Sequence, residues 1–226
     1  MNILAIETAT PACAVALRTR DGVERALIVD RERHHTEALA PGVDRLLREA
    51  GIAAKSIDRV VVDRGPGLFT GLRVGLATAL GLALGASADL VAVTSLEVLA
   101  LGAFSAGVRG RLVCVVDARR GELFTQSFAL EDAVRALDEA TVSAAGALVA
   151  TWAADEGAVT FSGDGAARYA AALGEVAAAS FFDQLVPSPL EAIHLGATRE
   201  PVTEVVPLYL READAVANFS TRERPA

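Results

Sequence analysis

The chain has 226 residues and a formal net charge of −8, from 21 basic and 29 acidic side chains. Hydrophobic residues make up 52% of it and charged residues 22%, which is typical of a globular protein with a sizeable core and excludes a disordered chain. Because an acidic protein repels the phosphate backbone on average, tight unassisted binding of nucleic acid is not expected.

Several features bear on the compartment of the protein. Cys13 and Cys114 lie in apolar alternating runs without metal or redox spacing, as expected for buried strand residues in a reducing cytosol. The N-terminus has no basic region or small-residue cleavage site, so no export is expected. The apolar stretch 74–93 approaches the length of a membrane span, but glycines divide it into a helix and a strand. We therefore expect a cytoplasmic protein without a membrane span.

The first third of the chain predicts a βββαβαβ order. Turn-forming residues separate its first three strand-like runs, which should form an antiparallel meander. Helical spacing of apolar residues follows, and then a buried strand, a glycine-rich loop and a second helix that Thr70 opens. The predicted elements are strands at 2–8, 12–18 and 23–30, a helix at 39–50, a strand at 59–63, a helix at 71–85 and a strand at 90–93. This order is that of the ribonuclease-H-like module, which also forms each half of the actin fold.

A second half begins near Leu112 in this interpretation. Runs at 112–117 and 122–129 predict a hairpin, and a strand at 159–162 leads into a glycine turn. We therefore predict an α/β protein of the actin-like ATPase (ribonuclease-H-like) fold, with two subdomains that each hold a mixed five-stranded sheet and helices. The expected division is 1–105 and 106–226, with the C-terminal tail free to return to the first subdomain. The halves share no sequence repeat but could repeat in structure.

Glu7 and Thr8, at the end of the first strand, are candidates for contact with a nucleotide. In an actin-like protein a carboxylate there holds magnesium-bound water, and hydroxyls and backbone N–H groups meet phosphate. Here the turn has no glycine, and Pro11 removes a donor. The alternative is that Thr8 and Thr10 only stabilise a hairpin turn through local hydrogen bonds.

Two glycine-containing turns are candidate anion sites. In the segment 64–73 a loop with Gly65 and Gly67 runs into a helix whose first turn holds Thr70 and Arg73, and helix N-termini attract anions. The segment lacks the P-loop lysine. A second, shorter turn contains Gly163 and Gly165. In both cases the alternative is structural, with glycines for tight turns, Thr70 as a helix cap and Arg73 as a surface or interface cation.

Other catalytic chemistry has little support in the sequence. The histidines, which are His34, His35 and His194, make no HxxxH or HExxH pair, so neither a zinc hydrolase nor a bound metal is expected. A two-metal nuclease would need converging carboxylates, for which Glu7, Asp63 and either Glu37 or Glu49 are weak candidates. No serine or cysteine has an evident general base beside it.

The sequence also resembles the TsaB family, which is also called YeaZ, in segments that follow one another along nearly the whole chain. The most specific segment is GPGLFTGLR at 65–73. The other matching segments are 3–10, 33–37, 116–122, 163–166 and 207–211. Two positions depart from the family pattern: Glu7 replaces the usual aspartate, and Asp63 stands where glycine is typical.

The resemblance implies a non-catalytic scaffold subunit without a cofactor. Its partner would be a TsaD-type subunit, which transfers threonylcarbamoyl to the adenosine beside the anticodon of tRNA, and a TsaE-type ATPase would join them. The chain would meet tRNA only indirectly and would form a homodimer when alone. The alternative is an ATP-binding actin-like enzyme that acts by itself, with the regions of Glu7, Gly67 and Gly163 as its site.

The predicted partner surface lies on the two helices of the first half. Gly71, Gly75, Ala79 and Ala83 recur every four residues, and glycines in a helix interior cost up to about 1 kcal/mol each. Close approach of another helix would explain them. The predicted interface residues are Leu39, Val43, Leu46, Leu47, Gly71, Leu72, Gly75, Leu76 and Ala79. The alternative is that the small-residue ridge packs on the chain's own sheet.

Overall fold

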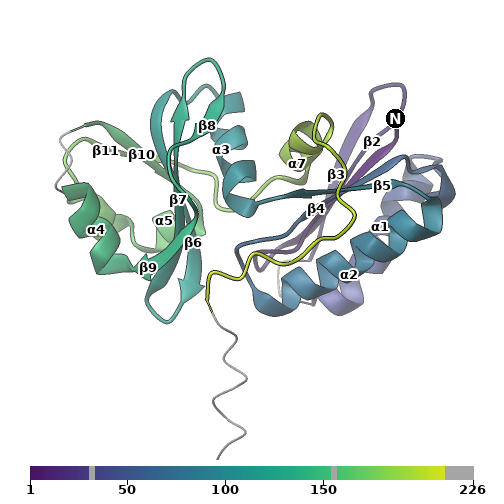
Figure 1. Ribbon diagram of the computed structural model, residues 1–226, viewed down its shortest axis with the longest axis horizontal. Coiled ribbons are helices and arrows are strands. Elements are labelled where there is room, and N and C mark those ends of the chain that lie inside the picture. The colour runs from purple at the N-terminus through teal and green to yellow at the C-terminus, as the bar shows by residue number, and fades with distance from the viewer. Residues whose placement is uncertain (31–33, 154–156, 212–226) are drawn as a thin grey trace, which may run out of the picture.

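The computed structural model describes residues 1–30, 34–153 and 157–211, and Arg33 of one family-like segment lies outside these ranges. Two α/β halves lie side by side, each built on one β-sheet (Figure 1). The last described segment runs from the first half to the junction between the halves. The chain therefore has the two-part arrangement that the sequence predicts.

The first sheet has the strand order β3-β2-β1-β4-β5. β1 pairs with β2 and β2 with β3 in antiparallel fashion, as the predicted meander requires, whereas β1–β4 and β4–β5 are parallel. β1, β2 and β4 are buried because their branched and small apolar residues face helices on both sides of the sheet, whereas the edge strand β3 is largely exposed. Their bounds are β1 Ile3–Glu7, β2 Cys13–Arg18, β3 Glu24–Asp30, β4 Arg59–Asp63 and β5 Asp89–Val93.

Helices α1 (His35–Glu49) and α2 (Phe69–Ala86) cover one face of this sheet, and α7 (Pro189–Gly196) covers the other (Figure 1). A short 3-10 turn, η1 (Ala54–Ser56), precedes β4. The predicted cap at Thr70 is wrong, because α2 begins at Phe69 after Leu68, which gives no side-chain cap. By length and composition alone α2 is long and apolar enough to cross a membrane, and it is the one helix in the described residues of which this is true.

The second sheet has the order β11-β10-β6-β7-β8, and β9 pairs with β7 beside this path. It therefore has six strands in the described residues, where five were predicted, because the chain after β7 makes two short strands instead of one. Order and strand directions otherwise repeat those of the first sheet. The bounds are β6 Gly110–Arg119, β7 Glu122–Leu130, β8 Val134–Ala136, β9 Thr141–Ala144, β10 Val159–Ser162 and β11 Ala179–Phe182.

Two helices pack across the predicted division at residue 105. α3 (Ser95–Ser105) precedes the division, but its Leu96 and Leu99 belong to the core of the second sheet. α7 comes from the C-terminal part and packs Ala192 and Ile193 on the first sheet. α3 and α7 also contact each other, so the halves are tied together. The remaining helices are α4 Ala145–Ala153, α5 Asp164–Arg168 and α6 Ala170–Leu173.

Candidate functional site

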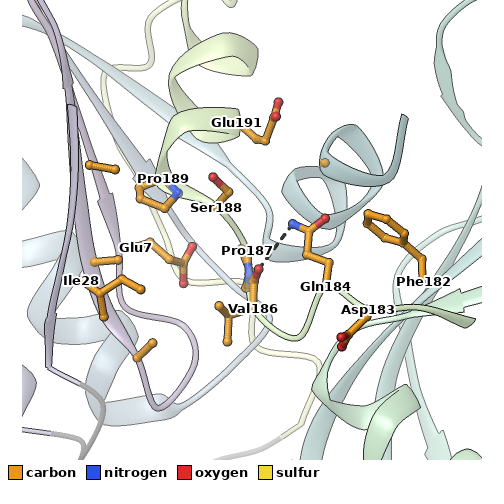
Figure 2. Close-up of a pocket in the computed structure, with 14 residues that line it drawn as sticks. Glu7, Ile28, Phe182, Asp183, Gln184, Val186, Pro187, Ser188, Pro189 and Glu191 are labelled. Carbon is orange, nitrogen blue, oxygen red and sulfur yellow. Dashed lines mark hydrogen bonds between the residues drawn. The ribbon is translucent and has the colours of Figure 1, made fainter. Parts of the chain in front are cut away.

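The turn between β1 and β2, the first candidate for phosphate contact, is sealed by its own chain. Thr8 and Thr10 are buried, and the backbone N–H of Leu68 donates to the carbonyl of Ala9 at 2.7 Å. Neither threonine hydroxyl has a hydrogen-bond partner in the described residues, so the local hydrogen bonds expected of them are not made. The His35 Nε2 lies 3.0 Å from the Thr10 carbonyl. The turn is therefore covered from the side of α2, whereas Glu7 and Ala12 at its two ends line a pocket on the other face of the sheet (Figure 2).

Glycines in the loop before α2 and in its first two turns make this seal possible. A Cβ at Gly67 would collide with the Ala9 carbonyl oxygen, and a Cβ at Gly71 would collide with that of Thr8. At Gly75 a Cβ would collide with the Thr8 hydroxyl. The glycines thus permit close packing of α2 on the β1–β2 turn, which is the structural alternative for this segment.

Thr70 and Arg73 are exposed on α2 and face elsewhere. The Arg73 guanidinium lies 3.8 Å from the centroid of the Phe69 ring, and its Nε donates to the Tyr209 hydroxyl at 3.1 Å. Phe69 and Tyr209 stack with 5.2 Å between ring centroids. Arg73 therefore holds the C-terminal segment on α2. It does not form one site with Glu7 in the described residues.

The glycines of the second turn, Gly163 and Gly165, also permit close packing. A Cβ at Gly163 would collide with the Val115 carbonyl, and a Cβ at Gly165 would come within 2.8 Å of the Val115 side chain. Between them, an Asp164 carboxylate oxygen accepts from the Asp117 N–H at 3.0 Å. Gly163 and Gly165 therefore bring α5 against β6, and the structure does not join them to Gly65 and Gly67 in one site.

Glu7 and Asp63, which the sequence analysis named together as candidate converging carboxylates, form a buried pair of acids. They end the adjacent parallel strands β1 and β4, point to the α7 face, and hydrogen-bond to each other. Glu7 Oε1 accepts from the Ala9 N–H at 2.8 Å, and Asp63 Oδ1 accepts from the Gly65 N–H at 2.7 Å. The two departures from the family pattern are therefore neighbours. The signal in the sequence was that both acids end buried strands of the same module.

Burial decides the protonation of this pair. Loss of water raises the pKa of Glu7 well above its usual range, and the charge of Asp63 raises it further. Burial also raises the pKa of Asp63 to about 6, against the lowering effect of its hydrogen bond with Glu7. Of the two acids, Asp63 therefore ionises first, and Glu7 keeps its proton to higher pH.

All nine predicted interface residues face the chain's own core. On α1, Leu39, Val43, Leu46 and Leu47 are buried, and on α2, Leu76 and Ala79 belong to the same core cluster. Leu72, Gly71 and Gly75 are buried against the sheet and the β1–β2 turn. The small-residue ridge thus packs inward, which corrects the expectation that its members touch a partner directly, and any partner contact falls to outward-facing residues.

Two repeated ribonuclease-H-like sheets joined by crossing helices define an actin-like protein. A family model described as "TsaD: tRNA N6-adenosine threonylcarbamoyltransferase" matches residues 29–218. The chain is 31% identical to the tRNA threonylcarbamoyladenosine biosynthesis protein TsaB of Bacillus subtilis, over 97% of this chain and 98% of that protein. It therefore belongs to the TsaB (YeaZ) family.

A solved structure and a second relative agree with this assignment. YeaZ from Pseudomonas aeruginosa superposes with a TM-score of 0.80 at 29% identity, over 92% of this chain and 99% of that one. The TsaB protein of Escherichia coli is 41% identical over 124 residues, which are 55% of this chain and 53% of that protein. In that relative and the one from Haemophilus influenzae, the match spans about half of their length.

Proposed function

We propose that this chain is a non-catalytic scaffold subunit of the cytoplasmic assembly that transfers threonylcarbamoyl to the adenosine beside the anticodon of tRNA. Its direct partner in this proposal is a TsaD-type catalytic subunit, and a TsaE-type ATPase joins them. Two relatives in the same family are named tRNA threonylcarbamoyladenosine biosynthesis proteins, which supports a role in this process. The β1–β2 turn, which has no glycine and is covered by α2 at Thr8 and Ala9, supports a role without catalysis or cofactor. The net charge of −8 supports contact with tRNA only through other subunits.

The outward face of α2 is the observation that supports a protein partner. We define the outer stripe of α2 as Ala77, Leu80, Gly81, Leu84 and Gly85, all of which are exposed. Leu84 is 73% exposed and Leu80 is 43% exposed. These residues carry no charge, and large apolar patches on a protein surface mark interaction sites. A partner helix could pack closely on the stripe because Gly81 and Gly85 have open space where a Cβ would stand.

The nine residues first predicted for the interface keep an indirect role in this proposal. They fix α1 and α2 on the sheet, so that the outer stripe is presented on a rigid surface. α1 lies beside α2 and exposes charged residues, among them Asp44 and Arg45, which would form a polar rim (Figure 1). We propose that the same surface forms a homodimer when no TsaD-type subunit is present.

The test is co-purification with a TsaD-type subunit from the same organism and measurement of the mass of the isolated chain by light scattering. We expect a dimer alone and a heterodimer with the partner. The double substitution Leu80→Glu and Leu84→Glu should give a folded monomer that binds the partner at least about tenfold more weakly. Leu185→Glu, at a residue 48% exposed on the other half, is the control. Unchanged assembly of the double variant would place the interface elsewhere.

The alternative function, an actin-like ATPase that acts alone, has its own measurement. Since the β1–β2 turn is closed by α2, we expect the isolated chain with magnesium and ATP to release phosphate no faster than a blank. Turnover above the blank that disappears in Glu7→Ala would refute the scaffold proposal.

A further inference from the structure

The outward face of α2 extends beyond the outer stripe to the start of the helix. Thr70 and Arg73, in the first two turns, are exposed like the residues of the stripe. They precede Ala77 and Leu80 at helical spacing, and residues three or four apart lie on the same side of a helix. Arg73 is the only charged residue of α2. This long and largely apolar face therefore carries a single cation, near its N-terminal end.

Two aromatic rings hold this cation in place. The Arg73 guanidinium lies 3.8 Å from the centroid of the Phe69 ring, and its Nε donates to the Tyr209 hydroxyl at 3.1 Å. The two rings stack with 5.2 Å between their centroids. We define the arginine anchor as Phe69, Arg73 and Tyr209. Side chains that are fixed in this way lose little conformational freedom when a partner binds them.

Tyr209 belongs to the C-terminal segment, which runs near the start of α2 toward the second half (Figure 1). On one side of Tyr209, the Leu208 N–H donates to the Arg64 carbonyl at 2.8 Å. On its other side, the Arg211 guanidinium donates to Glu122 of the second half at 3.0 Å. The segment is therefore fixed on both sides of Tyr209, which still remains 43% exposed. The arginine anchor is thus an ordered feature of the surface.

The arginine anchor still has hydrogen-bond donors to offer. The two terminal nitrogens of Arg73 have no acceptor in the described residues. By contrast, Arg45 and Arg48, which are exposed on α1, pair with acids of the same helix at 2.7 and 2.8 Å. A partner that covers the outer stripe and Arg73 removes water from the guanidinium, and this is costly without an acceptor. Such a partner has to supply an acceptor, and a carboxylate matches the planar guanidinium best.

We propose that the arginine anchor is the polar end of the partner surface, where Arg73 binds a carboxylate of the protein partner while the outer stripe binds an apolar helix. This inference rests on the proposed function, because it names the chemistry of the partner at the same surface. The partner that fits has a helix with small or apolar residues along one side and an aspartate or glutamate near one end. Aromatic residues and arginine are also the types that contribute most to protein interfaces.

A second copy of the chain is less suited to the arginine anchor. Its α2 has no acid, and on α1 Asp44 and Glu49 already pair with arginines of the same helix. Glu37 is the one other acid of these two helices. We therefore expect Arg73 to strengthen the complex with the TsaD-type subunit and not the homodimer. A homodimer that is weakened by both Arg73→Gln and Glu37→Gln would make a second copy the occupant and overturn the assignment.

The experiment measures the affinity of the full chain for the TsaD-type subunit by surface plasmon resonance, at about 0.1 M and about 0.5 M salt. Arg73→Gln should weaken binding about tenfold or more at low salt, and its affinity should depend less on salt than that of the wild type. Tyr209→Phe keeps the ring stack but removes the hydroxyl that orients Arg73, so it should weaken binding about threefold. Arg109→Gln is the matched control, because the Arg109 guanidinium lies 4.1 Å from the centroid of the Phe104 ring, away from α2. It should bind like the wild type.

Failure of this inference and failure of the proposed function give different results. If the Leu80→Glu, Leu84→Glu variant loses the partner but Arg73→Gln binds like the wild type, the outer stripe is confirmed and the arginine anchor is wrong. If neither variant loses the partner, the surface on α2 is wrong altogether. An equal loss in Arg73→Gln and Tyr209→Ala, with the salt dependence of the wild type kept in both, would show that Arg73 only holds the C-terminal segment and would overturn the inference.

Discussion

At the scale of single residues, the most informative feature is the pair of acids at the ends of β1 and β4. Each acid accepts a backbone N–H from the turn that follows its strand, Ala9 for Glu7 and Gly65 for Asp63. The two turns that meet the N-terminal part of α2 are therefore fixed by the same pair. Because both carboxyl groups are buried, their second oxygens depend on a shared proton.

The first residue-scale prediction concerns stability against pH. The pKa values of Glu7 and Asp63 in the folded chain lie above those of the unfolded chain, so folding binds protons. The contribution of this pair to stability is then largest in acid and is lost as pH rises through about 6, the pKa of Asp63. Glu7→Gln removes one acid and offers Asp63 an N–H donor. Urea unfolding at about pH 8 should show a gain of roughly 1–2 kcal/mol and a weaker pH dependence.

Glu175→Gln, at an exposed residue, is the control and should follow the wild-type pH profile. If Glu7→Gln were as pH-dependent as the wild type, the pair would not be the cause of the profile.

At the scale of elements, the glycines of α2 serve two different purposes. Gly71 and Gly75 face the β1–β2 turn and leave no room for a side chain, whereas Gly81 and Gly85 face outward. The helix is apolar on both sides, since the inner side lies on the sheet and the outer stripe is free of charge. One helix thus supports the core and offers a surface to a partner.

The element-scale prediction compares two alanine substitutions in this helix. Gly71→Ala should destabilise the chain by roughly 1–3 kcal/mol, because the new Cβ meets a backbone carbonyl that cannot turn away. Gly81→Ala should stabilise it by up to about 1 kcal/mol, because alanine favours a helix interior and the site is open. Thermal or urea unfolding of both variants measures the difference. Equal effects would show that the inward packing of α2 is not as described.

At the scale of the whole molecule, the C-terminal part of the chain completes the first half. α7 packs on the first sheet, and Arg59 of β4 holds its end through carbonyls more than 130 residues away in sequence. The Arg59 guanidinium donates to the carbonyls of Gly196, Ala197 and Arg199 at 2.8, 3.1 and 3.0 Å, and to Asp89 at 2.8 Å. The segment then continues to Arg211, which donates to Glu122 of the second half.

The whole-molecule prediction is that Arg59→Leu costs roughly 2–4 kcal/mol, because one buried and two partly buried carbonyl groups lose their donor at once. Proteolysis should then cut first near α7, and urea unfolding should begin at lower denaturant. Arg48→Leu, which removes an exposed ion pair on α1, should change stability by no more than about 0.5 kcal/mol. A loss as small as that for Arg59→Leu would mean that the C-terminal segment is not held by this side chain.

The sequence by itself determined the strands and helices of the first half, the two-part fold and the family, because periodicity and turn residues act locally. The segment at 65–73 indicates the family for a similar reason, because it is one short continuous motif. It did not determine which side of α2 faces the sheet, since a helix that is apolar all round has no polar side to mark its outside. Local pattern consequently favours an outward ridge, although Gly71 and Gly75 pack on Thr8 and Ala79 and Ala83 pack in the core.

Only the tertiary structure decided the features that depend on distant residues. It showed that Asp63 and Glu7 are fully buried and hydrogen-bond to each other, since burial at the strand ends depends on the elements that cover the sheet. It also showed that two short strands, β8 and β9, both pair with β7, and that a pocket remains beside Pro189. It further showed that α3 packs on the second sheet and α7 on the first. Each of these results from packing between segments far apart in the chain, and local pattern carries no information on such contacts.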